Sequence, residues 1–176
     1  MRITGGELRG RRLPAPPRGV RPTTDRVREA LFSILGQDLE GVRVLDAFAG
    51  SGVLSFEALS RGAASATLVE QNRTTAAWIR SQARTLGLEA AIRVVVGRSP
   101  KRVPAGRWDL AFLDPPYELD PGPTLAAVAP RVTGRVVVEH DPAREPPDAP
   151  EHFVLETTRT YGSTALSLYQ RTGGLA

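Results

Sequence analysis

Strand-like and helix-like segments alternate from residue 42 to residue 139 of this 176-residue chain, and this alternation constrains the fold most. Short aliphatic and β-branched runs predict strands at 42–48, 66–70, 92–96, 110–113 and 136–139. Helices are predicted at 53–61, from Asn72 to residue 86, and, shorter, at 123–130. Strands that alternate with helices predict an α/β fold whose parallel sheet is covered on both faces.

The C-terminal part of the chain breaks this alternation. Residues 153–160 and 164–171 predict two strands joined by a turn at 161–163. Such a hairpin adds antiparallel pairing to a parallel sheet. We therefore expect a Rossmann-like, seven-stranded, mostly parallel sheet that ends in an antiparallel hairpin.

The N-terminal part precedes the alternation. Residues 2–13 predict a β-hairpin that turns at Gly5-Gly6, and the proline-rich residues 14–22 predict an extended linker. Thr23 or Thr24 is expected to cap a helix that Gly36 ends, with an apolar face at helical spacing. That face comprises Val27, Ala30, Leu31, Ile34 and Leu35. We therefore divide the chain into a basic arm with its linker, residues 1–22, and a domain over 23–176.

Positive charge is concentrated in the first 28 residues. The chain carries a net charge of +4, and Lys101 is its one lysine among 23 basic residues. Eight of the arginines precede residue 29, where only Glu7 and Asp25 oppose them. A basic end of this kind predicts contact with a polyanion such as RNA. The candidate RNA-binding residues are Arg2, Arg9, Arg11, Arg12, Arg21 and Arg26.

Several classes of protein are disfavoured by composition. The chain has no cysteine, so disulfides, thiolate catalysis and zinc–thiolate sites are excluded. His140 and His152 are its only histidines and no motif pairs them, so we expect no metal site. The N-terminus has no apolar segment typical of a signal peptide, and no stretch approaches membrane-spanning length. We expect a cytoplasmic protein with no membrane contact.

A glycine turn follows the first predicted strand of the sheet. Gly50 and Gly52 let the backbone approach a ligand, but Ser55 stands where the third glycine of a dinucleotide fingerprint would lie. Asp46 is suited to the ammonium group of a methionine moiety. Glu70 ends the second strand, where an acid can accept both ribose hydroxyls. Together with Phe48, Gln71 and Ser99, these residues form the predicted cofactor site.

The segment Asp114-Pro-Pro-Tyr117 follows a later buried strand. An exocyclic amino group must regain tetrahedral character before it attacks a methyl group, and the Asp114 carboxylate can accept its hydrogens. Pro115 and Pro116 bring no competing N–H donor, and Tyr117 offers a flat face for an extruded base. With the glycine turn upstream, this segment predicts an S-adenosylmethionine-dependent methyltransferase that acts on a base amino group.

The residues also resemble a known family. Segments 2–13, 21–32, 45–52, 57–63, 114–117 and 161–169 are similar, in order, to the bacterial 16S rRNA guanine-N2 methyltransferases of the RsmD type. The resemblance implies methyl transfer to N2 of one guanine in small-subunit rRNA, within an assembly intermediate. We expect the enzyme to be a monomer. The segment Gly97-Arg-Ser99 departs from the acid that methyltransferases of this fold often place near the adenine.

Two other functions fit parts of this pattern. A DNA adenine-N6 or cytosine-N4 methyltransferase would use an Asp-Pro-Pro-Tyr segment in the same way. Such enzymes, however, generally need a separate target-recognition region, and the roughly 40 residues that precede the first strand here are few for one. A non-catalytic nucleic-acid-binding scaffold would use only the basic arm. A scaffold would not need the acids of the predicted cofactor and base sites, and all three are present: Asp46, Glu70 and Asp114.

Overall fold

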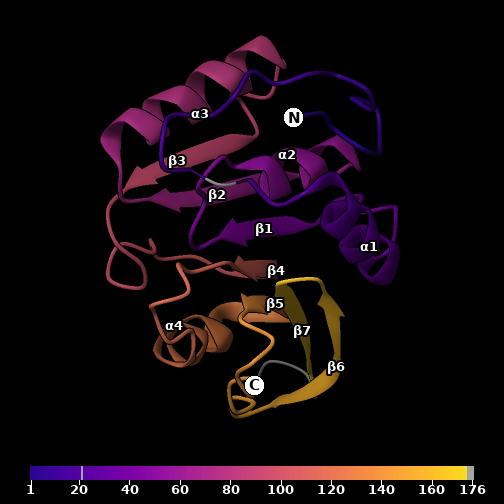
Figure 1. Ribbon diagram of the computed structural model, residues 1–176, viewed down its shortest axis with the longest axis vertical. Helices are drawn as coiled ribbons and strands as arrows, with labels where there is room; N and C mark the ends of the chain where they lie inside the picture. The colour runs from indigo at the N-terminus through magenta and orange to yellow at the C-terminus, as the bar shows by residue number, and fades with distance from the viewer. Residues whose placement is uncertain (21, 174–176) are drawn as a thin grey trace.

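The computed structural model describes residues 1–20 and 22–173, whose strands form one seven-stranded sheet (Figure 1). The strands lie in the order β3-β2-β1-β4-β5-β7-β6. Their bounds are β1 Arg43–Asp46, β2 Ser65–Glu70, β3 Ile92–Val96, β4 Trp108–Leu113, β5 Val132–His140, β6 Phe153–Tyr161 and β7 Thr164–Arg171. Strands β1 to β5 are parallel, whereas β7 runs antiparallel to both β5 and β6. The predicted α/β sheet with an antiparallel C-terminal hairpin is confirmed.

The described chain has four α-helices, of which the first precedes β1 and the other three connect parallel strands. They are α1 Asp25–Leu35, α2 Val53–Ser60, α3 Arg73–Thr85 and α4 Gly122–Val128, which continues as the short 3₁₀ helix Ala129–Arg131. Thr24 caps α1 by accepting the backbone N–H of Val27 at 3.4 Å. Asn72 caps α3 by accepting the N–H groups of Thr74 and Thr75. Both caps agree with the sequence, because capping depends on residues within one helical turn.

Three strands differ from their predicted bounds by two or more residues, and β4 is one of them, because it begins at Trp108 rather than at residue 110. β1 ends at Asp46 rather than at residue 48, since the chain enters the glycine turn there. β5 begins at Val132, four residues before its prediction. It pairs with β4 around an irregularity between Trp108 and Leu110, and a Cβ at Gly134 would lie 2.5 Å from the carbonyl oxygen of Asp109. Glycine at 134 therefore permits this close backbone approach.

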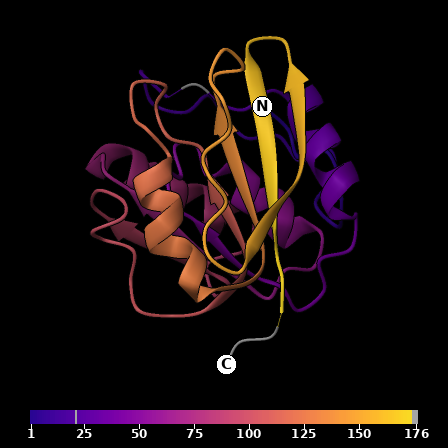
Figure 2. The ribbon, with the colours of Figure 1, turned by 90° about the horizontal axis from the view of Figure 1, so that it is seen from below.

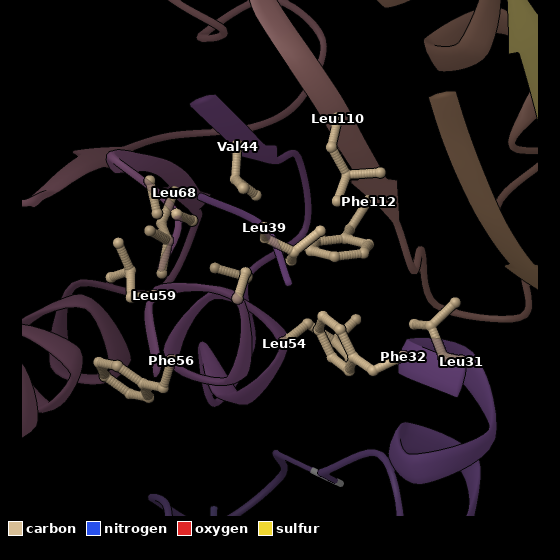
Figure 3. Packing of buried hydrophobic residues seen from close by; sticks show 14 of the residues in the cluster. Leu31, Phe32, Leu39, Val44, Leu54, Phe56, Leu59, Leu68, Leu110 and Phe112 are labelled. Carbon is tan, nitrogen blue, oxygen red and sulfur yellow. The ribbon is translucent and has the colours of Figure 1, made fainter. Parts of the chain in front are cut away.

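The sheet buries a separate apolar cluster on each face. Alternation along β4 sends Leu110 and Phe112 to one face and Ala111 and Leu113 to the other. The first face is covered by α1, α2 and α3, and the second by α4 (Figures 1 and 2). Figure 3 shows the first cluster, in which the rings of Phe32 and Phe112 meet edge to face at 6.1 Å. This packing joins α1 directly to the strand that carries the Asp-Pro-Pro-Tyr segment.

The predicted N-terminal hairpin is present as an antiparallel return of the chain, but its turn is longer than the predicted two residues. Arg2 and Arg12 form an antiparallel bridge flanked by backbone hydrogen bonds between the two halves, and the chain reverses through residues 5–10. The N–H groups of Glu7 and Leu8 bond to Ser60 of α2 at 2.7 and 2.9 Å, so they are not available for strand pairing. The arm therefore docks against α2, beside which its indigo ribbon lies (Figure 1).

Apolar side chains of the arm enter the main core. Ile3 is fully buried and Leu13 is 4% exposed, and both belong to the cluster on the α1 face of the sheet. The division between an arm over 1–22 and a domain over 23–176 stays a prediction. The described contacts make the arm a packed part of the structure.

A buried ionic cluster fixes the arm to α1 and α2. Glu57, which is fully buried, accepts hydrogen bonds from Arg28 at 3.1 Å, from the backbone of Thr4 at 2.8 Å, and from Arg61. The Arg61 guanidinium also lies 4.2 Å from the ring centre of Phe32. Breaking such a cluster is costly because a buried charge is left without its partner. Arg28 thus contributes to folding, although the charge count placed it in the basic surface segment.

Candidate active site

A cleft of about 870 Å³ opens at the carboxyl ends of the parallel strands. The strand order reverses between β1 and β4, and such switch points are where open α/β sheets bind ligands. The cleft receives residues from the loops after β1 to β4, from the carboxyl end of β5, from the β6–β7 turn, and from the segment that precedes α1. Its wall includes ten of the predicted site residues: Asp46, Phe48, Gly50, Glu70, Gln71, Ser99, Asp114, Pro115, Pro116 and Tyr117.

The glycine turn connects β1 to α2. Gly50 and Gly52 have φ values of 51° and 68°, in the left-handed region that favours glycine. Gly52 does not line the cleft, because a Cβ there would point at Leu68, 3.1 Å away, and at Ile79. Its role in the structure is the close packing of α2 on the sheet. Gly50 lines the cleft and donates its N–H to Glu70 at 2.9 Å.

Glu70 lies at the end of β2 and is 9% exposed. One carboxylate oxygen accepts the N–H of Gly50, and the other accepts the N–H of Asn72 at 2.7 Å. Glu70 thereby ties the glycine turn to the start of α3. Each carboxylate oxygen can accept more than one hydrogen bond, so these contacts are compatible with a ribose hydroxyl at the same group.

Asp46 ends β1 and is 2% exposed. Burial, with a smaller contribution from the charge of Glu70, raises the pKa of Asp46 to about 7. Hydrogen bonds from the Ser55 hydroxyl, at 3.0 Å, and from the backbone of Phe48 act in the opposite direction. A buried carboxylate with so few neutralising partners has a strong preference for a cationic ligand. The ammonium group of a methionine moiety is such a cation.

The loop after β3 closes another part of the cleft. Gly97 donates its N–H to the carbonyl of Glu70 at 2.9 Å, which holds this loop against the end of β2. The buried hydroxyl of Ser99 has no hydrogen-bond partner among the described residues. An orphaned buried hydroxyl that borders the cleft fits contact with a polar ligand atom, such as one on an adenine.

The Asp-Pro-Pro-Tyr segment follows β4 directly. Asp114 is half-buried, and burial, followed by the charges of Glu139 and Asp46, raises its pKa well above the usual range. Pro115 is buried. Tyr117 is 42% exposed and donates its hydroxyl hydrogen to the carbonyl oxygen of Ser163 at 3.1 Å. The segment therefore presents a carboxyl group and an aromatic face to the same cleft.

Sequence reasoning missed several residues of the cleft. Glu139 at the end of β5, Thr164 at the start of β7 and Arg18 of the linker all line it. A signal for Glu139 was present, because an acid follows an apolar strand there just as Asp114 follows β4. Arg18 was counted in the basic segment but was not selected as a candidate. Within residues 1–20 and 22–173, no cluster of three or more metal-ligating side chains occurs.

The candidate RNA-binding arginines occupy the surface. Arg9, Arg11, Arg12 and Arg26 are exposed, and no ion pair of theirs is found among the described residues. Arg2 is also exposed but pairs with Asp25 at 3.1 Å. Arg21 lies outside the described residues. The described helices include none that is long and apolar enough to cross a membrane.

The sheet order, the glycine turn after β1 and the Asp-Pro-Pro-Tyr segment after β4 define a class I S-adenosylmethionine-dependent methyltransferase fold. The solved structure of the Escherichia coli protein yhhF has a TM-score of 0.87, with 36% identity and 98% of each chain covered. The structure of the Thermus thermophilus protein TTHA0928 has a TM-score of 0.80 and 32% sequence identity, with 96% of this chain and 98% of that chain covered.

Curated relatives cover nearly the same span. "Ribosomal RNA small subunit methyltransferase D" of Escherichia coli K12 is 37% identical, over 97% of this chain and 90% of its own. The protein of the same name from Haemophilus influenzae is 34% identical, over 97% of this chain and 93% of its own. The family model described as Conserved hypothetical protein 95 matches residues 1–170. The chain belongs to this family, which confirms the resemblance to the RsmD type.

Proposed function

We propose that this protein transfers a methyl group from S-adenosylmethionine to the exocyclic N2 of one guanine in 16S rRNA. The observation that carries the proposal is the meeting of two parts in one cleft: the glycine turn with Asp46 and Glu70, and the Asp114–Tyr117 segment. Full-length relatives named small-subunit rRNA methyltransferases support the same substrate class.

The residues of the cleft fit the cofactor. Asp46 would hold the ammonium group, Glu70 the ribose hydroxyls and the orphaned Ser99 hydroxyl a polar atom of the adenine. Gly50 has no side chain, so its backbone can approach the cofactor. Phe48 and Gln71 line the same part of the cleft. When bound, S-adenosylmethionine supplies a methyl group made electrophilic by the adjacent sulfonium.

The segment after β4 would bind and orient the target base. Tyr117 would stack on the extruded guanine, and Asp114 would accept a hydrogen bond from N2, which directs the nitrogen lone pair toward the methyl carbon. Transfer of that methyl group to N2 would leave the nitrogen positively charged, so that it would then have to lose a proton. Asp114 can take that proton at a carboxylate oxygen, and its raised pKa favours the transfer.

The exposed arginines would hold the RNA backbone. Arg9, Arg11 and Arg12 lie close together in the chain and lack neighbouring aromatic residues, which suits phosphate contact rather than base reading. We further propose that the substrate is a small-subunit assembly intermediate and that the enzyme acts as a monomer in the cytoplasm.

Parallel methyl-transfer assays test the proposal. Isotope-labelled S-adenosylmethionine is offered with naked 16S rRNA, small-subunit assembly intermediates, mature small subunits and DNA, and the product nucleoside is identified by mass spectrometry. We expect N2-methylguanosine from one position of 16S rRNA and no labelled DNA. N6-methyladenine or N4-methylcytosine in DNA would instead identify a DNA methyltransferase, and no labelled product in any arm would favour a non-catalytic scaffold.

A further inference from the structure

A second carboxylate, that of Glu139, lies beside Asp114 and has no part in the mechanism above. Leu113 of β4 pairs with Val138 of β5, so the next residues of these parallel strands, Asp114 and Glu139, emerge side by side at the same edge. Both line the cleft, and the charge of Glu139 contributes to the raised pKa of Asp114. Two like charges placed together are unfavourable, and a ligand that supplies hydrogen-bond donors to both relieves their repulsion.

The orientation of Glu139 is controlled from β7. The Thr164 hydroxyl, which belongs to a 6% exposed residue, donates to one carboxylate oxygen of Glu139 at 2.7 Å. Thr164 also lines the cleft and directly follows the β6–β7 turn that holds the Tyr117 hydroxyl. A side chain oriented in this way can present an acceptor in a defined direction.

Guanine differs from other bases in the atoms beside its amino group. Its N2 amino group adjoins N1–H, a second donor, on the Watson–Crick edge. The amino groups of adenine and cytosine adjoin a ring nitrogen that is an acceptor. A carboxylate facing that ring nitrogen would accept a hydrogen bond from guanine and would repel the lone pair of adenine or cytosine.

We infer that Glu139 accepts a hydrogen bond from N1–H of the target guanine while Asp114 accepts one from its N2 amino group, so that the carboxylate pair selects guanine. This inference rests on the proposed function and names the residue that determines its base specificity. Thr164 acts as a positioning residue for Glu139.

The test replaces the target base with 2-aminopurine. This base keeps an amino group at C2, but its N1 carries no proton and accepts a hydrogen bond. Ligation of a synthetic oligonucleotide places either base at the methylated position of 16S rRNA, which is used naked or reconstituted, whichever the wild-type protein methylates. The readout is the ratio of kcat/KM for guanine to kcat/KM for 2-aminopurine.

Glu139→Gln should lower this ratio at least about tenfold, because the amide N–H can donate to N1 of 2-aminopurine. Thr164→Val should lower it by a smaller factor, since the hydroxyl that orients Glu139 is removed. Glu89→Gln makes the same chemical change at an exposed residue outside the cleft, and should leave the ratio unchanged. Thermal melting checks that each variant is folded, and Thr164→Val carries the test if Glu139→Gln is not.

Two outcomes separate the inference from the function beneath it. A ratio within about twofold of wild type, with kcat/KM lowered equally for both bases, would show that Glu139 is structural and would overturn the inference. Failure of the wild-type protein to methylate N2 of any guanine would overturn the proposed function before the variants are compared.

Discussion

The hydroxyl of Tyr117 donates a 3.1 Å hydrogen bond to the backbone carbonyl of Ser163, which lies 46 residues later in the chain. The bond joins the loop after β4 to the β6–β7 turn, and residues of both segments line the cleft. The C-terminal hairpin is therefore part of the site wall as well as an extension of the sheet. The tyrosine ring is held at the mouth of the cleft while 42% of the residue stays exposed.

Tyr117→Phe should lower kcat by no more than about tenfold, because it removes one exposed hydrogen bond and keeps the aromatic face. Tyr117→Ala should raise KM for RNA more strongly, since base–aromatic stacking contributes about 1–3 kcal/mol. Steady-state kinetics on the RNA substrate measures both constants. Equal losses in the two variants would mean that the bond to Ser163, rather than stacking, is the function of Tyr117.

Asp114→Ala should lower kcat by about 10²–10⁴-fold and leave the affinity for S-adenosylmethionine nearly unchanged, because the carboxylate is proposed to contact the target amino group and not the cofactor. Asp114→Asn should keep part of the activity, since an amide oxygen still accepts a hydrogen bond. Single-turnover methylation and calorimetry with the cofactor give the two quantities. Wild-type turnover by Asp114→Ala would remove this residue from the mechanism.

Glu70→Ala should weaken the binding of S-adenosylmethionine by roughly 1–3 kcal/mol, because the proposed acceptor for the ribose hydroxyls is lost together with the hydrogen bond from Gly50. Calorimetry measures this change directly. Glu89→Ala, at an exposed position outside the cleft, is the matched control. Unchanged affinity in Glu70→Ala would place the ribose elsewhere.

The affinity for S-adenosylmethionine should rise with pH and level off above about 7. Burial raises the pKa of Asp46 to about 7, so below that pH its carboxyl is protonated and must lose a proton before it can pair with the ammonium group. Each pH unit below 7 should therefore weaken binding about tenfold, with one proton released on binding. Calorimetry between pH 5.5 and 7.5, in buffers of different ionisation enthalpy, measures both effects.

Two variants show which carboxyl group is responsible. Asp46→Asn should bind the cofactor weakly and with little pH dependence, whereas Asp114→Asn should retain the wild-type dependence. A pH dependence that persists in Asp46→Asn would assign the titration to another group.

The N-terminal arm should show separate effects on stability and on RNA binding. Ile3→Ala should lower the free energy of unfolding by about 2–5 kcal/mol, because Ile3 is fully buried in the main core. Replacing Arg9, Arg11 and Arg12 by Gln should leave the melting temperature nearly unchanged. The triple variant should flatten the log–log salt dependence of RNA affinity by about 0.7–0.9 for each phosphate that an arginine no longer neutralises.

Arginines outside the arm provide the charge-matched control. Arg84, Arg93 and Arg107 are exposed and do not line the cleft, so their replacement by Gln removes the same charge elsewhere. An equal change in the salt dependence of the control variant would show that the arm contributes only through the net charge of the protein, and not through its own phosphate contacts. Deleting residues 2–13 is a less informative test, because it would also remove Ile3 and Leu13 from the core.

Several parts of the fold were predictable because their causes are local. The cap of α1 at Thr24 and that of α3 at Asn72 depend on residues within one turn. The glycine turn after β1 and the loop that begins at Asp114 also follow from adjacent residue types. The apolar alternation predicted a parallel sheet, but it misjudged where β1 ends and where β5 begins, since those limits depend on neighbouring strands.

The arm shows why local signals can fail. Gly5-Gly6 predicts a two-residue turn, yet the Gly5 carbonyl and the two N–H groups that follow Gly6 bond to Ser60 of α2, so the reversal is longer than predicted. Arg28 counted as surface charge, yet it is buried against Glu57, 29 residues away. Neither partner could be identified from the segment itself, because the choice between alternative hydrogen bonds depends on which groups the folded chain brings near.

The sequence by itself determined the class of fold, the glycine turn after β1, and the acids that end or follow β1, β2 and β4, because periodicity and turn chemistry act between neighbours in the chain. Only the tertiary structure placed Glu139 beside Asp114 and oriented it through Thr164. It also turned Gly52 toward the core and tied Tyr117 to Ser163. These contacts arise from strand order and register, which decide which distant residues meet at one edge of a sheet.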